Sequence, residues 1–224
     1  CWMVDEEENI FPKNDWKELE AECKIVFTEK ESVVRNFENR SALVQFVPPA
    51  IQLILAGAGN DVQPLVEMAS ILGWRIIVAD GRSTHATSRR FTKAASVLVC
   101  KAQGLLALNL ADEQTAFVLM SHNYNYDLDM LSQLVNVSCL YIGILGPKKK
   151  LQRLLDELSE KGIHLNKEQV QKIHGPVGLD IGAETSEEIA LSVLSVIKAV
   201  FSKRDASSLK FKTSPIHHNY SVIE

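Results

Sequence analysis

A short glycine turn is the first place where this sequence could bind a ligand. The turn Gly57-Ala58-Gly59-Asn60 follows the apolar run 51–56 and leads directly into a helix-forming segment. Glycine suits this position because the backbone can bend tightly and a diphosphate can approach the amides at the helix N-terminus, where the helix dipole favours an anion. The pattern predicts a site for a phosphorylated ligand.

An acidic and a basic residue after the next apolar run extend this site. Asp80 closes the run 75–80, about 20 residues after the glycine turn, where dinucleotide-binding folds carry the acid that accepts hydrogen bonds from ribose. Arg82 could neutralise a phosphate, although an arginine in a loop is more often a solvated surface residue. Position and spacing together favour a dinucleotide-type fold.

Two residues next to the turn argue against tight dinucleotide binding. Val62 stands where the third glycine of the usual fingerprint permits close packing of helix and strand. Asp61 places a carboxylate in the first helical turn, where we expect it to cap the helix and to repel a pyrophosphate. A Rossmann-like fold that binds NAD(P) only weakly therefore stands beside the dinucleotide site as an alternative.

Three further segments could line the same site. Ser121 and His122 end a predicted strand, Gly146 and Lys148 mark a glycine turn before a basic helix start, and a glycine-rich loop with two acids precedes the last helix. Each segment also has a purely structural interpretation. A histidine at a strand end often only forms a structural hydrogen bond, and a turn can need glycine for its backbone geometry alone. Asp127, which follows His122, could be the cap of the next helix. The residues of the loop are Gly178, Asp180, Gly182 and Glu184.

Short apolar runs alternate with helix-period segments from residue 51 onward, which is typical of an α/β fold with a Rossmann-like parallel sheet and helices on both faces. The last helix, about 186–202, begins at a capping box formed by Thr185 and Glu188. Right-handed crossovers place all strand-to-helix turns at one edge, and the reversal of strand order opens a crevice between the first and fourth strands. We therefore predict that the four segments converge on one pocket. The predicted strands are 51–56, 75–80, 96–100, 115–121 and 138–144.

The pair Pro48-Pro49 interrupts the chain and suggests a domain boundary. The region before it is acidic and mixed, and the run 24–27 is predicted as a short strand. The predicted segments are a partial N-terminal domain or linker over 1–49, the Rossmann-like domain over 50–204, and a polar, loosely ordered tail over 205–224.

The composition excludes several classes of protein. The 224 residues carry a net charge of −4 and 46% hydrophobic residues, so the chain is globular and lacks the positive field that attracts nucleic acid. The four cysteines show no zinc-ligand spacing, which indicates free thiols in a reducing cytoplasm. No apolar run is long enough for a transmembrane helix, so we expect no membrane partner.

Four stretches then give a specific resemblance. From about Gln52 to Val200 the chain resembles the Rossmann domain of XdhC/CoxI proteins, the xanthine dehydrogenase accessory factors. The resemblance implies a chaperone that binds the molybdenum cofactor (molybdopterin), supports its sulfuration with a cysteine desulfurase, and passes it to an apo xanthine dehydrogenase-type molybdoenzyme. The stretches are LILAGAGNDVQPLVEMASILGWRIIVADGR, FVLMSHNYNYDLDML, YIGILGPKKK and GPVGLDIGAETSEEIALSVL.

The resemblance also assigns cofactor-binding positions, with no catalytic or metal-ligating residue among them. The resemblance places them on Asp80 with Arg82, on Ser121 with His122, on two glycines of the turn and on four residues of the later loop. The turn residues are Gly57 and Gly59, and the loop residues are Gly178, Asp180, Gly182 and Glu184. The family's N-terminal domain carries a Gly/Cys motif, and residues 1–49 contain no such motif.

Three functions therefore stand as alternatives. The first is the cofactor chaperone, which binds its phosphorylated pterin without catalysing a reaction on it. The second is an NAD(P)-dependent oxidoreductase, for which the chain offers no evident substrate domain and no activated Tyr-Lys or Cys pair. The third is a domain that binds only proteins. The sequence leaves the oligomeric state open, with a homodimer among the alternatives.

Overall fold

The computed structural model describes residues 3–4, 10–11, 17–37, 40–106, 111–216 and 221–223. The chain forms two compact units, one made of Cys1–Pro49 with Ser208–Glu224, and the other of Ala50–Ser207. Each unit is described by itself. Whether the three predicted segments fold as independent domains stays a prediction.

The smaller unit joins residues from both ends of the chain. Its three-stranded sheet has the order β11-β3-β4, with β3 and β4 antiparallel and β11 parallel to β3. The run 24–27, predicted as a strand, lies in α1 instead, because Cys23 and Val26 are one helical turn apart and are both buried. The elements are β1 (Met3–Val4), β2 (Ile10–Phe11), α1 (Lys17–Glu29), β3 (Val33–Phe37), β4 (Arg40–Val44), η1 (Leu209–Phe211) and β11 (Ser221–Ile223).

The predicted polar tail contains more regular structure than its sequence indicates. It includes η1, and β11 pairs with β3 in the small sheet. Backbone pairing of three residues gives no periodic signal, so the sequence could not show it. The predicted tail residues 217–220 lie outside the described residues.

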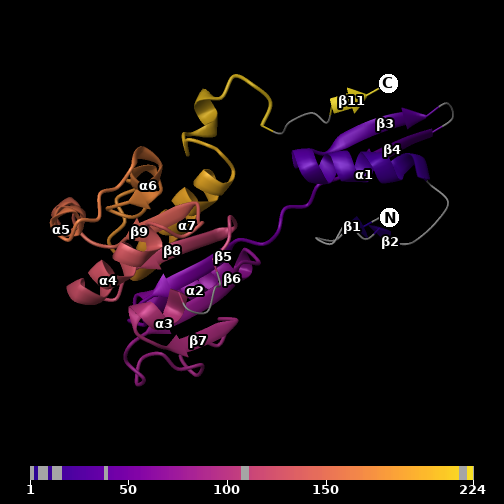
Figure 1. Cartoon of the computed structure of the whole chain (residues 1–224). Helices are drawn as coiled ribbons and strands as arrows, with labels where there is room; N and C mark the ends of the chain where they lie inside the picture. The colour runs from indigo at the N-terminus through magenta and orange to yellow at the C-terminus, as the bar shows by residue number, and fades with distance from the viewer. Residues whose placement is uncertain are drawn as a thin grey trace. The chain divides into compact units, whose positions relative to one another are not determined.

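The larger unit is built on a six-stranded sheet of order β10-β9-β8-β5-β6-β7, in which every pairing is parallel (Figure 1). The predicted Rossmann-like fold is confirmed. The strands are β5 (Gln52–Ala56), β6 (Arg75–Asp80), β7 (Ser96–Val99), β8 (Thr115–Leu119), β9 (Tyr141–Ile144) and β10 (Ile173–His174). The helices are α2 (Val62–Ile71), α3 (Ala102–Leu106), α4 (Tyr124–Leu134), α5 (Lys148–Glu160), α6 (Lys167–Gln171) and α7 (Ser186–Phe201).

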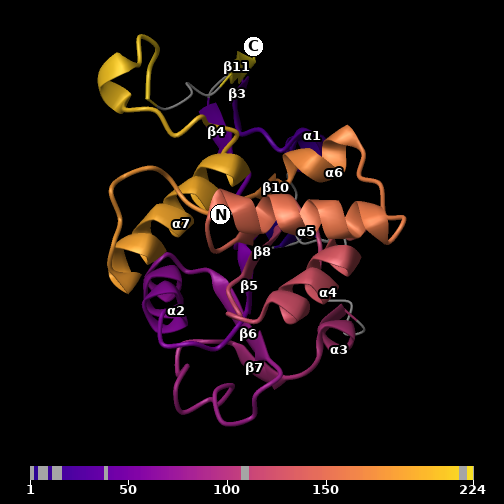
Figure 2. The same cartoon turned by 90° about the vertical axis from the view of Figure 1, so that its left-hand side faces the viewer.

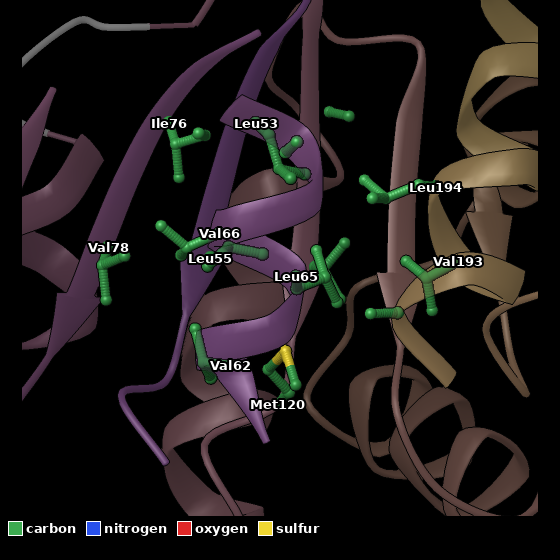
Figure 3. Packing of buried hydrophobic residues seen from close by; sticks show 14 of the residues in the cluster. Leu53, Leu55, Val62, Leu65, Val66, Ile76, Val78, Met120, Val193 and Leu194 are labelled. Carbon is green, nitrogen blue, oxygen red and sulfur yellow. The ribbon is translucent and has the colours of Figure 1, made fainter. Parts of the chain in front are cut away.

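Helices cover both faces of this sheet, with α2 and α7 on one side and α4 and α5 on the other (Figure 2). All five residues of β5 and of β8 are buried, which explains their continuous apolar sequence. On one face Leu53 and Leu55 pack against Leu65 of α2, next to Val193 and Leu194 of α7 (Figure 3). Burial of each such side chain contributes about 1.5–3 kcal/mol and holds the central strands in register.

In the described part of the chain no helix is long and apolar enough to cross a membrane.

Candidate functional site

The strand order places β5 beside β8, so the first and fourth predicted strands are neighbours as expected. The chain continues from β5 to β6 and β7 on one side, and from β8 to β9 and β10 on the other. The carboxyl ends of β5 and β8 are therefore the switch point of the sheet. Gly57 follows β5 there with a φ of 138°, and a Cβ on it would overlap the backbone of Met120 and Ser121. Glycine is therefore required where the turn passes the end of β8.

Asp80 holds the glycine turn in place. Its carboxylate accepts hydrogen bonds from the amides of Ala58 and Arg82, both at 2.8 Å, and from the Arg82 guanidinium at 2.9 and 2.6 Å. Burial acts to raise the pKa of Asp80, but the Arg82 side chain and these amides outweigh it and hold the pKa below its ordinary value. Both carboxylate oxygens are thus engaged within the chain, and ribose binding by Asp80 stays a prediction.

Asp61 does not cap α2, so that prediction was wrong. Its backbone has helical angles, φ −64° and ψ −16°, and its side chain makes no capping hydrogen bond, because a side-chain cap needs an extended backbone at this residue. Asp61 Oδ2 instead lies 2.9 Å from His122 Nε2. This pair links the turn after β5 to the turn after β8.

The Asp61 carboxylate also lies against the glycine turn. A Cβ on Gly59 would overlap Asp61 Oδ1 and come within 3.7 Å of the His122 ring. A pyrophosphate that approached this turn would meet a carboxylate held in place by His122. Weak binding of NAD(P) stays a prediction, and the capping role expected for Asp61 is wrong.

Arg90 is a site residue that was not predicted from the sequence. Its Nη1 donates to the carbonyls of Ala58 and His85, both at 2.7 Å, and its Nη2 donates to Asn60 Oδ1 at 2.8 Å. Arg90 lies in an irregular segment after β6, so no periodicity marked it. It fixes the conformation of the glycine turn from outside.

A buried ion pair organises the other side of the switch point. Ser121 Oγ donates to Asp127 Oδ1 at 2.6 Å, and Lys150 Nζ donates to Asp127 Oδ2 at 2.7 Å and to the Leu145 carbonyl at 2.8 Å. Asp127 is fully buried, and it does not cap α4, because Asn123 accepts from Tyr126 N in that role. Ser121 and the turn at Gly146 are thereby joined through one carboxylate.

Lys148 does not take part in this cluster. It is exposed, and its ammonium has no hydrogen-bond or ion-pair partner within the described ranges. Lys150, two positions further along α5, packs against Gly146, whose φ is 129°. Anion binding by Lys148 stays a prediction.

The glycine-rich loop after β10 begins at the same edge of the sheet. Val177 N donates to the carbonyl of Ile144, the last residue of β9, at 3.1 Å. Ser192 Oγ of α7 then exchanges two hydrogen bonds of 2.7 Å with the backbone of Leu179, and a Cβ on Gly178 would overlap this hydroxyl. The glycine is required by packing on α7.

The acidic end of this loop is exposed to solvent. Asp180, Gly182 and Glu184 are all exposed, and the two acidic side chains make no hydrogen bond or ion pair to any residue that the structure describes. The structure thus brings together the Gly57 turn with His122, and Gly146 with Ser121. Convergence of all four segments on one pocket stays a prediction.

A polar pocket of about 570 Å³ lies between the N-terminal ends of α3 and α4. Lys101 follows β7 and Asn123 follows β8, so the pocket is at the carboxyl edge of the sheet. Tyr126 OH, on the wall of this pocket, donates to the Cys100 carbonyl at 3.2 Å. Burial and the Asp80 carboxylate raise the pKa of the Cys100 thiol, which favours its neutral form. The polar lining residues are Lys101, Gln103, Asn123, Asn125, Tyr126 and Asp129.

This pocket was not predicted from the sequence, because α3 has only five residues and therefore shows no helical period. Among the residues that the structure describes, no group of three or more His, Cys, Asp or Glu side chains could hold a metal ion. The pocket lining consists of side-chain amides, a phenol hydroxyl, a lysine and a carboxylate, all of which can form hydrogen bonds.

A parallel sheet with a glycine turn at its switch point defines a Rossmann-type domain. The family model described as the XdhC Rossmann domain matches residues 53–197. The chain therefore belongs to the XdhC family.

Relatives and a solved structure agree with this assignment. A Bacillus subtilis protein named as a probable xanthine dehydrogenase subunit is 33% identical over 71% of this chain and 46% of its own length. The molybdenum cofactor insertion chaperone PaoD of Escherichia coli is 25% identical over 68% of this chain and 41% of its own length. The crystal structure of a xanthine dehydrogenase from Bacillus halodurans superimposes with a TM-score of 0.62 at 30% identity, covering 77% of this chain and 49% of that chain.

The chain spans less than half the length of these relatives. An uncharacterized Escherichia coli protein, YqeB, is 32% identical over 77% of this chain, which covers 31% of YqeB. The match is thus to one domain within longer proteins.

Proposed function

We propose that this protein is a molybdenum-cofactor-binding accessory protein for the maturation of xanthine dehydrogenase-type molybdoenzymes. The observation that carries the proposal is the match of residues 53–197 to the XdhC Rossmann domain, together with the relative named as a molybdenum cofactor insertion chaperone. The cofactor is cargo in this function, so the chain needs groups that bind and release it and no group that reacts with it.

The polar pocket fits the chemistry of such a cargo. Molybdopterin offers a heterocycle with donors and acceptors on its edge and a phosphate at the other end. The side-chain amides of Gln103, Asn123 and Asn125 can both donate and accept, and Lys101 adds a cation for the phosphate. A volume of about 570 Å³ lies within the range of small-molecule sites.

The chain's own residues would hold and orient this cargo. We assign the heterocycle edge to the amides of Asn123 and Gln103 and the phosphate to Lys101, with the Tyr126 hydroxyl already fixed by the Cys100 carbonyl. The Asp80, Arg82 and Arg90 contacts keep the neighbouring glycine turn rigid, so the edge is preorganised before binding. The bound cofactor would supply redox chemistry only after transfer to the apoenzyme.

The alternative of an NAD(P)-dependent oxidoreductase has less support from the geometry. Both oxygens of Asp80 are engaged by Arg82 and Ala58, and the Asp61 carboxylate lies against Gly59. A dinucleotide would have to displace both contacts, which costs binding free energy.

We also propose an apo xanthine dehydrogenase-type molybdoenzyme and a cysteine desulfurase as protein partners, and the cytoplasm as the location. Cys100 and Cys139 form no disulfide bond, which agrees with a reducing compartment. One relative and one solved structure are named as xanthine dehydrogenases, and the partners of this chain are inferred from them.

The test is mass spectrometry of small molecules released from the full-length protein after expression in cells that make the cofactor. We expect molybdopterin, and we expect Lys101→Ala with Asn123→Ala to reduce its recovery. The matched control, Lys161→Ala with Asn136→Ala, changes the same residue types outside the pocket and should retain it. A nicotinamide dinucleotide as the bound species would overturn the proposal.

A further inference from the structure

The outer side of α2 and α7 carries an apolar groove of about 640 Å³. Three exposed side chains stand on or beside it: Ile71 is 84% exposed, Leu72 54% and Leu191 53%. Single exposed apolar residues are ordinary, but a contiguous group that lines a groove indicates an interaction surface. Residues of α2, of α7 and of the segment after α7 line this groove. Figure 2 shows that α2 and α7 lie on the same side of the sheet.

Two charged side chains of α7, one acidic and one basic, indicate which kind of partner this groove would bind. Glu187 is exposed near the start of the helix and Lys198 is exposed near its end. Neither has an ion-pair partner among the described residues. Glu187, Leu191, Leu194 and Lys198 follow one another at three- and four-residue spacing, so they lie along one side of the helix.

These four residues are arranged symmetrically. Glu187 stands four positions before Leu191, and Lys198 stands four positions after Leu194. A two-fold axis midway between Leu191 and Leu194 would therefore place the acid of one helix on the base of an antiparallel copy, and the same contact would occur twice. Such self-complementarity is the requirement of an isologous interface.

We propose that this face binds a second copy of the chain, with the two α7 helices antiparallel about a two-fold axis. Leu191 of each copy enters the groove of the other, next to Leu194, and Glu187 pairs with Lys198 of the second copy at both ends. The two ion pairs are separated by about 16 Å along the helix axis, and the leucines between them are shielded from water. A partner protein that carried only positive or only negative side chains could pair with Lys198 or with Glu187, but not with both.

Sedimentation velocity of the full-length protein over a range of concentrations tests this interface. We expect a dimer, twice the chain mass of 24.9 kDa, that becomes a monomer when Leu191 is replaced by Asp. Val170→Asp is the matched control, because Val170 is 48% exposed on α6, away from the groove, and its replacement should leave the dimer intact. Circular dichroism verifies that both variants are folded.

A charge exchange gives a second, independent readout. Glu187→Lys or Lys198→Glu alone should weaken the dimer about tenfold, because each creates two like-charge contacts. The double exchange Glu187→Lys with Lys198→Glu should restore the wild-type affinity. A monomer at all concentrations, a dimer that survives Leu191→Asp, or a double exchange no tighter than the single variants would each overturn the proposal.

Discussion

Replacing Lys150 by Met should destabilise the Rossmann unit strongly, because it leaves the Asp127 carboxylate without its ammonium. Asp127 is fully buried and the Lys150 side chain is 19% exposed. Removing one member of a buried ion pair costs about 3–5 kcal/mol, and the partial exposure of Lys150 places the expected loss near the lower end, about 3 kcal/mol. Methionine keeps the aliphatic stem that packs against Gly146, so the loss reports the charge.

Urea unfolding monitored by circular dichroism measures this loss. A decrease of about 3 kcal/mol with a slope of about 2 kcal/mol per molar urea moves the midpoint by roughly 1.5 M. The control is Arg153→Met on the same helix, whose ion pair with Glu157 is exposed and should contribute less than about 1 kcal/mol.

A second variant separates the charge from the hydrogen bond. Asp127→Asn combined with Lys150→Met removes both charges and keeps an acceptor for the Ser121 hydroxyl, so it should recover much of the lost stability. A loss below about 1 kcal/mol in the single variant, or no recovery in the double variant, would show that the pair is not a structural requirement.

Three further outcomes are expected. Gly57→Ala should prevent stable folding, because φ is 138° and the new methyl group overlaps the Met120 backbone, whereas Gly162→Ala, with φ 80° and open space around it, should cost about 1 kcal/mol in a thermal melt. Burial lowers the pKa of His174, so its neutral ring, stacked on Tyr141, stabilises the fold fully above about pH 6.5. The free energy of unfolding measured by urea titration should fall below that pH, and His174→Phe should remove the part of this pH dependence that comes from the imidazole. Calorimetry should find NAD binding weaker than about micromolar, and Asp61→Asn should strengthen it; tight binding to the unchanged chain contradicts the role given to the carboxylate.

The sheet and the position of its switch point could be predicted from the sequence. Buried parallel strands are continuous apolar runs, and β5, β6 and β8 fall within the predicted ranges. The predicted strand 138–144 begins only at Tyr141, and β10, with two residues, has no pattern of its own. Short elements are set by tertiary contacts, such as the backbone hydrogen bond from Ile142 to Lys172, which no local window contains.

The glycine turn could be located, but the contacts that fix it could not. The sequence does not show whether Lys148 or Lys150 contacts the site, because the choice depends on Asp127, more than 20 residues earlier. It also does not show whether Asp61 caps a helix or pairs with His122, about 60 residues later. Arg90 was missed for the same reason, since its acceptors Ala58 and Asn60 lie about 30 residues earlier. Spacing predicts which residues share an edge, and only the packed structure shows which of them are already paired.

The pairing of β11 with β3 has a consequence for biosynthesis. The ribosome completes the strands of the Rossmann unit before it makes Ser221–Ile223, whereas the hairpin β3–β4 is made first. Nascent β3 therefore waits with one edge unpaired while more than 150 residues are translated, and the Rossmann unit can fold during that interval. The small sheet is therefore begun before the Rossmann unit is translated and completed after it.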